Sequence, residues 1–87
     1  MTLPWVYILR CGDGSLYTGA AKDLDARLAQ HQAGKASRYT RAHQPVAVAW
    51  SKELPSWSEC LKEEIRIKRL KRDHKERVVR GEAGANG

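Results

Sequence analysis

The sequence predicts one small α/β domain in which helices pack on a small sheet, with the elements in the order β-β-α-β-α. Three observations lead to this prediction. Two runs of strand-forming residues flank a cluster of turn residues near the N-terminus. A short helix with a capping residue follows, and a third strand precedes a long helix. No repeat or internal linker interrupts this order, which is typical of helices covering a sheet.

The first two strands form a hairpin in this prediction. Residues 5–11 read Trp-Val-Tyr-Ile-Leu-Arg-Cys and are rich in strand formers, and residues 16–20 form the second run. Between them stands Gly-Asp-Gly-Ser at 12–15, which is strong turn chemistry.

Asp23 is a plausible N-cap for a helix that runs to about Gln32, and Gly34 is the residue expected to end it. The polar, basic stretch 35–45 ends at Pro45 and is expected to be a loop, with room for a short helical turn.

The last strand and the last helix follow in the C-terminal half. Residues 46–51 alternate large and small side chains, as expected of a strand with one tightly covered face. Ser56 and Glu59 fit a capping box, although Ser58 is an equal candidate for the cap. The helix should run to about Lys71 and then either break or continue to Arg80. The glycine-rich stretch 81–87 is expected to be a disordered tail, so the domain should span 1–80.

Composition narrows the class of protein. Hydrophobic residues make up 41% of the 87 residues, too many for a disordered chain. With no Phe, the three tryptophans are expected to supply much of the core bulk. The net charge of +6 and the pI of about 9.7 indicate a polyanionic partner, the alternative being that the charge serves solubility alone.

The two cysteines, Cys11 and Cys60, lack metal-type spacing and are expected to be reduced, half-buried thiols. We find no signal-peptide pattern and no stretch near the ~20 apolar residues of a membrane span. The expectation is a cytoplasmic protein that does not contact membranes. The sequence is silent on oligomeric state, and we assume a monomer.

Polar residues fall on apolar helix faces at two places. Leu24, Arg27, Leu28 and His31 share one face of the first helix at 3.6 residues per turn. On the long helix, Glu64 falls near the centre of an arc formed by Trp57, Cys60, Leu61 and Ile67.

A carboxylate in that position needs a partner, which could be Arg27, His31, a backbone donor or a metal ion. The structural alternative is a partly buried Glu64–Arg27 ion pair, or a helix register that returns Glu64 to solvent. Tyr7 and Tyr17, on the two hairpin strands, are by themselves compatible with ordinary strand aromatics.

Taken together, these residues resemble a known family. The run from Pro4 to Leu9, followed by Leu16-Tyr17-Thr18-Gly19, resembles the paired strands of the GIY-YIG nuclease superfamily. Residues 21–31 are similar to its first helix and residues 58–68 to its metal-binding helix, so the resemblance covers about residues 3–72. It is strongest to the compact, stand-alone bacterial members, and the excision-repair nuclease subunit carries a similar domain.

The resemblance implies a three-stranded antiparallel sheet flanked by helices, and hydrolysis of phosphodiester bonds with one Mg²⁺ or Mn²⁺ ion. It implies that Glu64 is the metal ligand and that Arg27 stabilises the phosphate. Tyr7 and Tyr17 match the two motif tyrosines, which position or deprotonate the attacking water. His31 falls where relatives carry a His or Tyr near the scissile phosphate.

The choice of general base stays open among Tyr7, Tyr17 and His31. A phenol with a reference pKa of ~10 needs nearby positive charge to act near neutral pH, whereas a histidine with a reference pKa of ~6.5 does not.

Several positions depart from the family pattern. Trp5 replaces the first motif glycine, Thr18 replaces the isoleucine of the second motif, and Ala20 stands where some nucleases have a lysine. The downstream asparagine has no clear counterpart, since Asn86 lies in the tail.

A basic surface is the last feature. Residues 62–80 carry nine Lys or Arg and four Asp or Glu. The candidates for contact with a phosphate backbone, with one tyrosine for stacking on a base, are Lys35, Arg38, Tyr39, Arg41, Lys68, Arg69, Lys71 and Arg72. The alternative is a solvated helix face with pairs such as Glu64–Lys68 and Glu76–Arg80.

The expected function is therefore a metal-dependent endonuclease acting on nucleic acid, with DNA favoured over RNA. The alternatives are a non-catalytic nucleic-acid-binding module on the same scaffold and, less favoured, a protein-interaction adaptor.

Overall fold

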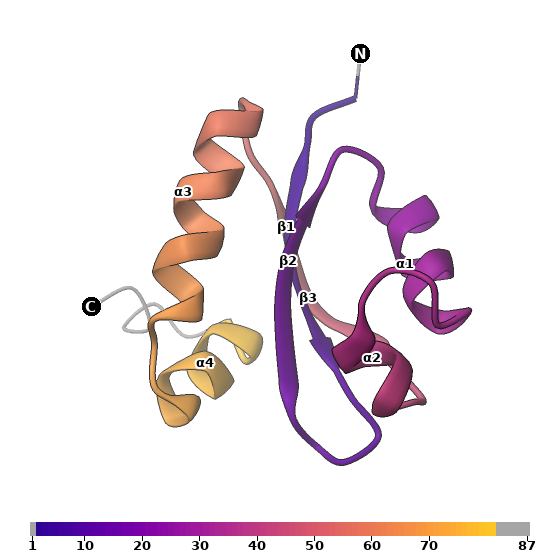
Figure 1. Ribbon diagram of the computed structural model, residues 1–87. Helices are drawn as coiled ribbons and strands as arrows, with labels where there is room; N and C mark the ends of the chain where they lie inside the picture. The colour runs from indigo at the N-terminus through magenta and orange to yellow at the C-terminus, as the bar shows by residue number, and fades with distance from the viewer. Residues whose placement is uncertain (1, 82–87) are drawn as a thin grey trace.

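A three-stranded antiparallel sheet forms the centre of the molecule in the computed structural model, which describes residues 2–81 (Figure 1). The strands are β1 (Trp5–Arg10), β2 (Leu16–Ala21) and β3 (Ala47–Glu53), in the order β2-β1-β3. The helices α1 (Leu24–Gln32) and α2 (Arg38–Ala42) cover one face, and α3 (Trp57–Lys68) and α4 (Arg72–Val79) cover the other. The predicted α/β fold, a small antiparallel sheet flanked by helices, is confirmed.

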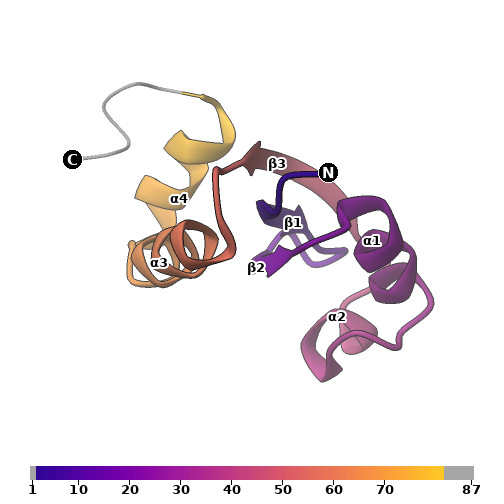
Figure 2. The ribbon, with the colours of Figure 1, turned by 90° about the horizontal axis from the view of Figure 1, so that it is seen from above.

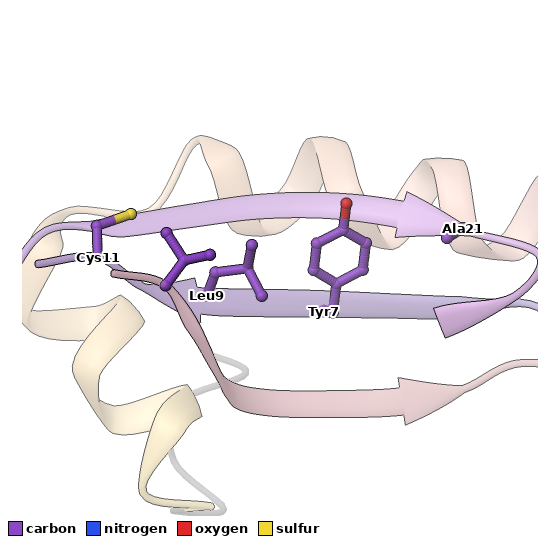
Figure 3. Packing of buried hydrophobic residues seen from close by; sticks show 5 residues of the cluster. Tyr7, Leu9, Cys11 and Ala21 are labelled. Atoms are coloured by element: carbon purple, nitrogen blue, oxygen red, sulfur yellow. The ribbon is translucent and has the colours of Figure 1, made fainter. Parts of the chain in front are cut away.

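The central strand is buried on both faces. Val6 and Ile8 point to the side of α3 and α4, where they pack with Ile67 and Val78. Tyr7, Leu9 and Cys11 project to the opposite side, as Figure 3 shows. Four consecutive residues of β1, from Val6 to Leu9, are at most 1% exposed, so this strand carries the core and fixes the position of Tyr7.

Local signals set the ends of α1 as predicted. The Asp23 carboxylate accepts a hydrogen bond of 3.0 Å from the Ala26 backbone N–H. At the other end Gly34 adopts φ +75°, and the N–H groups of Gly34 and Lys35 donate to the carbonyls of His31 and Gln30. This is a Schellman ending, which favours glycine at the left-handed position.

The C-terminal half resolves the alternatives that the sequence left open. Ser56 is the cap of α3 and accepts from the Glu59 N–H at 3.1 Å. The long helix breaks after Lys68, and Lys71 is extended before α4. Because of this break, Val78 of α4 returns to the sheet and is buried beside Val6 and Ile8. The stretch 35–45 contains the short helix α2, capped by Ser37.

Two core assignments from the sequence are wrong. Leu61 was placed on the buried arc of α3, but its side chain is 38% exposed, while Cys60 and Ile67 are fully buried. Of the three tryptophans only Trp50 packs against a core cluster, because Trp5 lies at a strand end and Trp57 at a helix start. Both cysteines are free, as expected, but more deeply buried than expected, at 4% and 0% exposure. The predicted tail lies, from residue 82 on, outside the described residues.

Two buried threonines give a stability prediction. Thr18 lies opposite Ile8 on β2, is 4% exposed, and its hydroxyl has no hydrogen-bond partner within residues 2–81. Thr18→Val keeps the shape and removes the unpaired hydroxyl, so the free energy of unfolding should rise by about 1 kcal/mol. Urea unfolding measures this change.

Thr40→Val is the matched control, because this equally buried hydroxyl contacts His31 and Ser37 at 2.8 and 3.0 Å. Its replacement should lower the free energy of unfolding by about 1–3 kcal/mol. A loss of stability in Thr18→Val would contradict the prediction.

Candidate active site

A buried chain of hydrogen bonds links the first motif tyrosine to α1 and α2. The Tyr7 hydroxyl lies 2.8 Å from Nε2 of His31, and Nδ1 of His31 lies 2.8 Å from the hydroxyl of Thr40. Tyr7 and His31 are each 1% exposed, and Thr40 is fully buried. Both ring nitrogens of His31 are engaged in these contacts, and neighbouring side chains shield the ring almost completely from solvent.

Gly19 makes room for this chain. It pairs with Tyr7 across the hairpin, and a Cβ atom at Gly19 would lie 2.5 Å from the Tyr7 hydroxyl oxygen. Any side chain here would push the phenol off His31. The requirement for glycine in the second motif therefore comes from close approach, since its backbone φ is not in the left-handed region.

The surroundings of Tyr7 bring the other sequence-predicted residues together. Burial first, and then the neighbouring Tyr17, raise the pKa of Tyr7 to about 12. The charge of Arg27 and its hydrogen bond to the phenol lower this pKa, while negative Glu64 raises it. The four residues come from β1, β2, α1 and α3, so the fold gathers them around one phenol.

Tyr17 lies between this buried chain and the surface. Its ring meets His31 edge-on at 5.2 Å and lies parallel to Tyr39 at 6.0 Å. Tyr39 in turn stacks on His43 at 4.2 Å, and its hydroxyl donates to Ser15. Tyr17 is partly exposed, unlike Tyr7 and His31. Among the three candidate bases it is the one that solvent reaches.

Arg27 faces an open pocket. Its side chain is half-buried, as the helical pattern predicted, and within residues 2–81 no carboxylate lies at ion-pair distance from it. Arg27 lines a pocket of about 320 Å³ between the start of α1 and Trp57 of α3. A partly desolvated guanidinium that has no carboxylate partner and lies beside a pocket is suited to binding an anion.

Glu64 does not pair with Arg27, so the proposed structural ion pair between the two helices is absent from the described chain. Its carboxylate is 18% exposed and lies 3.2 Å from Lys68 one turn further along α3. This is the i,i+4 pair that the alternative for the basic helix predicted. Glu76, the acidic member of the other suggested pair, binds Arg10 through two contacts of 2.7 Å.

The donor set around Glu64 fits a hard cation that keeps most of its waters. Within the described part of the chain, no three His, Cys, Asp or Glu side chains gather to hold a metal ion. A single, partly exposed carboxylate suits Mg²⁺, which is commonly held by one or two carboxylates, water and substrate phosphate. Glu64 is therefore the residue that fits a metal here.

The predicted basic residues form two groups on opposite faces of the sheet. Lys35, Arg38 and Arg41 line one pocket of about 260 Å³ at the start of α2. The other group lies at the junction of α3 and α4: Lys68, Arg69, Lys71 and Arg72. The β1–β2 turn lies between them, since Arg72 donates to the Gly14 carbonyl at 2.7 Å and Tyr39 contacts Ser15.

The sequence did not reveal the part that Thr40 plays. It is nine residues from His31, and only the packing of α2 against α1 brings its hydroxyl to the ring. The available signal was Ser37 three residues before it, which caps α2 through the Thr40 N–H.

Burial of His31 predicts how stability changes with pH. Burial first, and then the nearby charge of Arg27, lower the pKa of His31 below 6.5. The unfolded chain therefore takes up a proton near pH 6.5 that the folded chain resists. The stability contributed by neutral His31 is complete above that pH and is lost as pH falls toward the folded-state pKa.

The midpoint temperature of thermal unfolding should accordingly decrease as the pH is lowered from about 7.5 to about 5.5. The fall should be smaller in His31→Gln, while His74→Gln, altered in a helix away from the site, should keep the wild-type slope. An unchanged slope in His31→Gln would contradict this account.

Comparison with known proteins gives consistent matches over nearly the whole chain. A sequence model of the GIY-YIG catalytic domain matches residues 3–77. The UPF0213 protein of Staphylococcus epidermidis is 43% identical over 75 residues, covering 86% of this chain and 92% of the relative. A UPF0213 protein of Staphylococcus aureus is 42% identical over 76 residues, covering 87% and 93%.

Two solution NMR structures are similar to this fold. The UPF0213 protein of Bacillus halodurans is 40% identical with a TM-score of 0.60, and a protein of E. faecalis is 31% identical with a TM-score of 0.63. Each covers 93% of this chain and 86% of the other. The names of these relatives state no activity. No helix within residues 2–81 is long and apolar enough to cross a membrane.

Proposed function

This chain belongs to the GIY-YIG catalytic domain family, a family of nucleases, and on that premise we propose that it is a divalent-metal-dependent endonuclease of nucleic acid, with DNA as the favoured substrate. The observation that carries the proposal is the pairing pattern around Tyr7. Arg27 and Glu64 both act on the pKa of this phenol, yet they do not pair with each other. A half-buried arginine without a carboxylate partner could bind a phosphate, and a carboxylate whose partner is only a lysine could bind a cation.

Glu64 would hold one Mg²⁺ or Mn²⁺ ion, whose chemistry there is to neutralise charge on the phosphate and to lower the pKa of a bound water. Lys68 is the present partner of this carboxylate and has to yield it to the ion. A surface lysine pair of this kind contributes only about 0.2–1 kcal/mol, so the exchange is not costly.

Arg27 would bind the phosphate that is cut. Its planar guanidinium can donate two parallel hydrogen bonds to phosphate oxygens. It would also stabilise the negative charge that grows on the phosphate as the water attacks. Its place in the wall of the pocket between α1 and α3 makes it accessible to a strand that lies there.

Tyr17 is the candidate that contacts the attacking water, because it is partly exposed while Tyr7 and His31 are buried. Tyr7 and His31, which are buried next to Tyr17, would hold it in position. In one tautomer of neutral His31, Nε2 accepts a hydrogen bond from the Tyr7 hydroxyl while the Nδ1–H donates to Thr40, so that tautomer would satisfy both contacts. The high pKa of Tyr7 suits this positioning role at neutral pH better than that of a base.

The two basic groups would hold the nucleic-acid backbone on either side of the β1–β2 turn. Lys35, Arg38 and Arg41 offer three cations around one pocket, and Arg69 and Lys71 are exposed on the other side. Such contacts bind phosphates without reading sequence. Tyr39 would contribute less than the sequence suggested, because its ring already stacks on His43.

The second candidate is a binding module that keeps the scaffold without catalysis. The Glu64–Lys68 ion pair favours it, because a carboxylate satisfied by lysine does not require a metal. The missing counterpart of the downstream asparagine points the same way.

The test is a cleavage assay on single-stranded, branched and duplex DNA and on RNA, with Mg²⁺, Mn²⁺ or a chelator. We expect cutting that needs the metal and is absent from Glu64→Gln protein purified in the same way, which controls for contaminating nucleases. Binding to these substrates without any cutting would instead establish the binding module.

A further inference from the structure

Trp57 is a large aromatic residue that the core does not use. It is the first residue of α3, is half-buried, and belongs to neither cluster of core side chains in residues 2–81. Its ring lies under a cation, the Lys22 ammonium, 5.6 Å from the ring centroid. A tryptophan at the surface with a lysine over it is unusual for a purely structural side chain, since indole gains most from burial.

Trp57 and Lys22 form the shared wall of two adjacent pockets. The first, of about 320 Å³, extends toward Arg27 and Gln30. The second, of about 400 Å³, extends toward Thr2 and Pro4. We call the two together the Trp57 groove. It runs from the phosphate-binding arginine of the proposed site past the indole, and each part is within the range of ~300–1,000 Å³ that holds small organic groups.

The charges in this groove suit an anion with a flat apolar part. Lys22 and Arg27 supply two positive charges. Asp23 also lines the groove, but its carboxylate is engaged as the N-cap of α1. Figure 2 shows the start of α1 and the start of α3 on either side of the edge strand β2. Ala21, the last residue of β2, lines the first pocket, so the groove lies beside the strand that carries Tyr17.

We infer that the Trp57 groove seats one unpaired nucleotide of the strand that is cut, next to the scissile phosphate, with its base stacked on Trp57 and its phosphate bound by Lys22. This rests on the proposed function for the role of Arg27. An exposed cation–π contact is weaker than a charge-assisted hydrogen bond to phosphate, so Lys22 gains by leaving the indole for the backbone.

The consequence is a preference for strands that are single at the cutting point. A base inside a duplex has both faces covered by its neighbours, so an indole can stack on it only after it leaves the helix, at a cost in unstacking. In a single strand, a gap or a branch, the face is already open. The stacking is tolerant of sequence, because every base has a π-face.

The test is equilibrium binding in a chelator, which prevents cutting, with fluorescent DNA and RNA single strands and the duplex of the same sequence. Trp57→Ala should weaken binding to the single strand about tenfold or more, and binding to the duplex less than about twofold. Trp57→Phe should keep most of the affinity, because phenylalanine still stacks. Thermal unfolding shows that each variant is folded. The single strand that binds more tightly identifies DNA or RNA as the source of the nucleotide.

Two results would overturn the inference: a folded Trp57→Ala protein that binds single strands like wild type, or one that loses single strand and duplex equally. Failure of the groove is distinguishable from failure of the nuclease. If Trp57→Ala weakens single-strand binding but the wild-type protein cuts no substrate, the groove is supported and the nuclease proposal is contradicted. If the protein cuts intact duplex as fast as single strand, and Trp57→Ala does not change either rate, the nuclease proposal is supported and the inference about the groove is contradicted.

Discussion

Glu64→Gln should lower the rate of metal-dependent cleavage by at least about 100-fold, because the amide cannot supply the negative charge that a hard cation requires. The change keeps the size of the side chain and its place on α3, where Glu64 is 18% exposed. Folding should be little affected, since the ion pair with Lys68 is at the surface. Initial rates at saturating Mg²⁺ and Mn²⁺ measure the effect.

Glu63→Gln is a closely matched control. Glu63 is the preceding residue of α3, its side chain is 20% exposed, and it is paired with Arg66 one turn away. The Arg66 guanidinium holds the pKa of Glu63 below its ordinary value, and Lys52 contributes to this. The control should therefore lose some stability at neutral pH and keep its cleavage rate. Equal loss of cleavage in the two variants would show that Glu64 has no special role.

Arg27→Ala should lower kcat/KM by about 100-fold or more, with most of the loss in kcat, because the guanidinium meets charge that grows as the phosphate is attacked. Arg27→Lys should recover only a small part of the kcat/KM that Arg27→Ala loses. Its ammonium keeps the charge but cannot donate two parallel hydrogen bonds. Loss of Arg27 also removes a group that lowers the pKa of Tyr7, so the phenol becomes still harder to ionise.

Arg77→Ala removes the same charge from an exposed position on α4 and controls for the general attraction of nucleic acid. Arg77→Ala should raise KM at low salt and leave kcat unchanged. If Arg27→Ala lost no more than Arg77→Ala, the arginine would belong to the binding surface and not to the reacting site. Rates on one single-stranded substrate at two salt concentrations separate these cases.

Local sequence signals predicted the elements well where a single residue decides the outcome. Asp23 and Gly34 set the ends of α1 through hydrogen bonds that span three to five residues. The turn at 12–15 joins β1 and β2 as predicted, and Ser15 bonds to the Asp13 carboxylate within it. Such features depend on φ, ψ and near neighbours, so the sequence contains most of what determines them.

The sequence was less informative where distant segments compete for one residue. It could not decide whether the last helix breaks, because residues 68–72 are compatible with either outcome, and the burial of Val78 against β1 decides it. It offered both Arg27 and Lys68 as partners of Glu64 without deciding between them, and in the structure the partner is Lys68, one turn away. It placed Leu61 inside, because a helical wheel gives the arc but not the part of it that the sheet covers.

The sequence by itself determined the element order, the basic charge and the set of motif residues that places the chain in its family. Only the tertiary structure decided which of those residues meet and which face water. Tyr7 and His31 are 24 positions apart, and it is the packing of α1 on the sheet that joins them and buries both. The same packing leaves Tyr17 and Arg27 at the surface, because they lie where β2 and α1 border the open edge of the sheet. Burial depends on what covers a residue, and in a chain this small the covering side chains come from distant parts of the sequence.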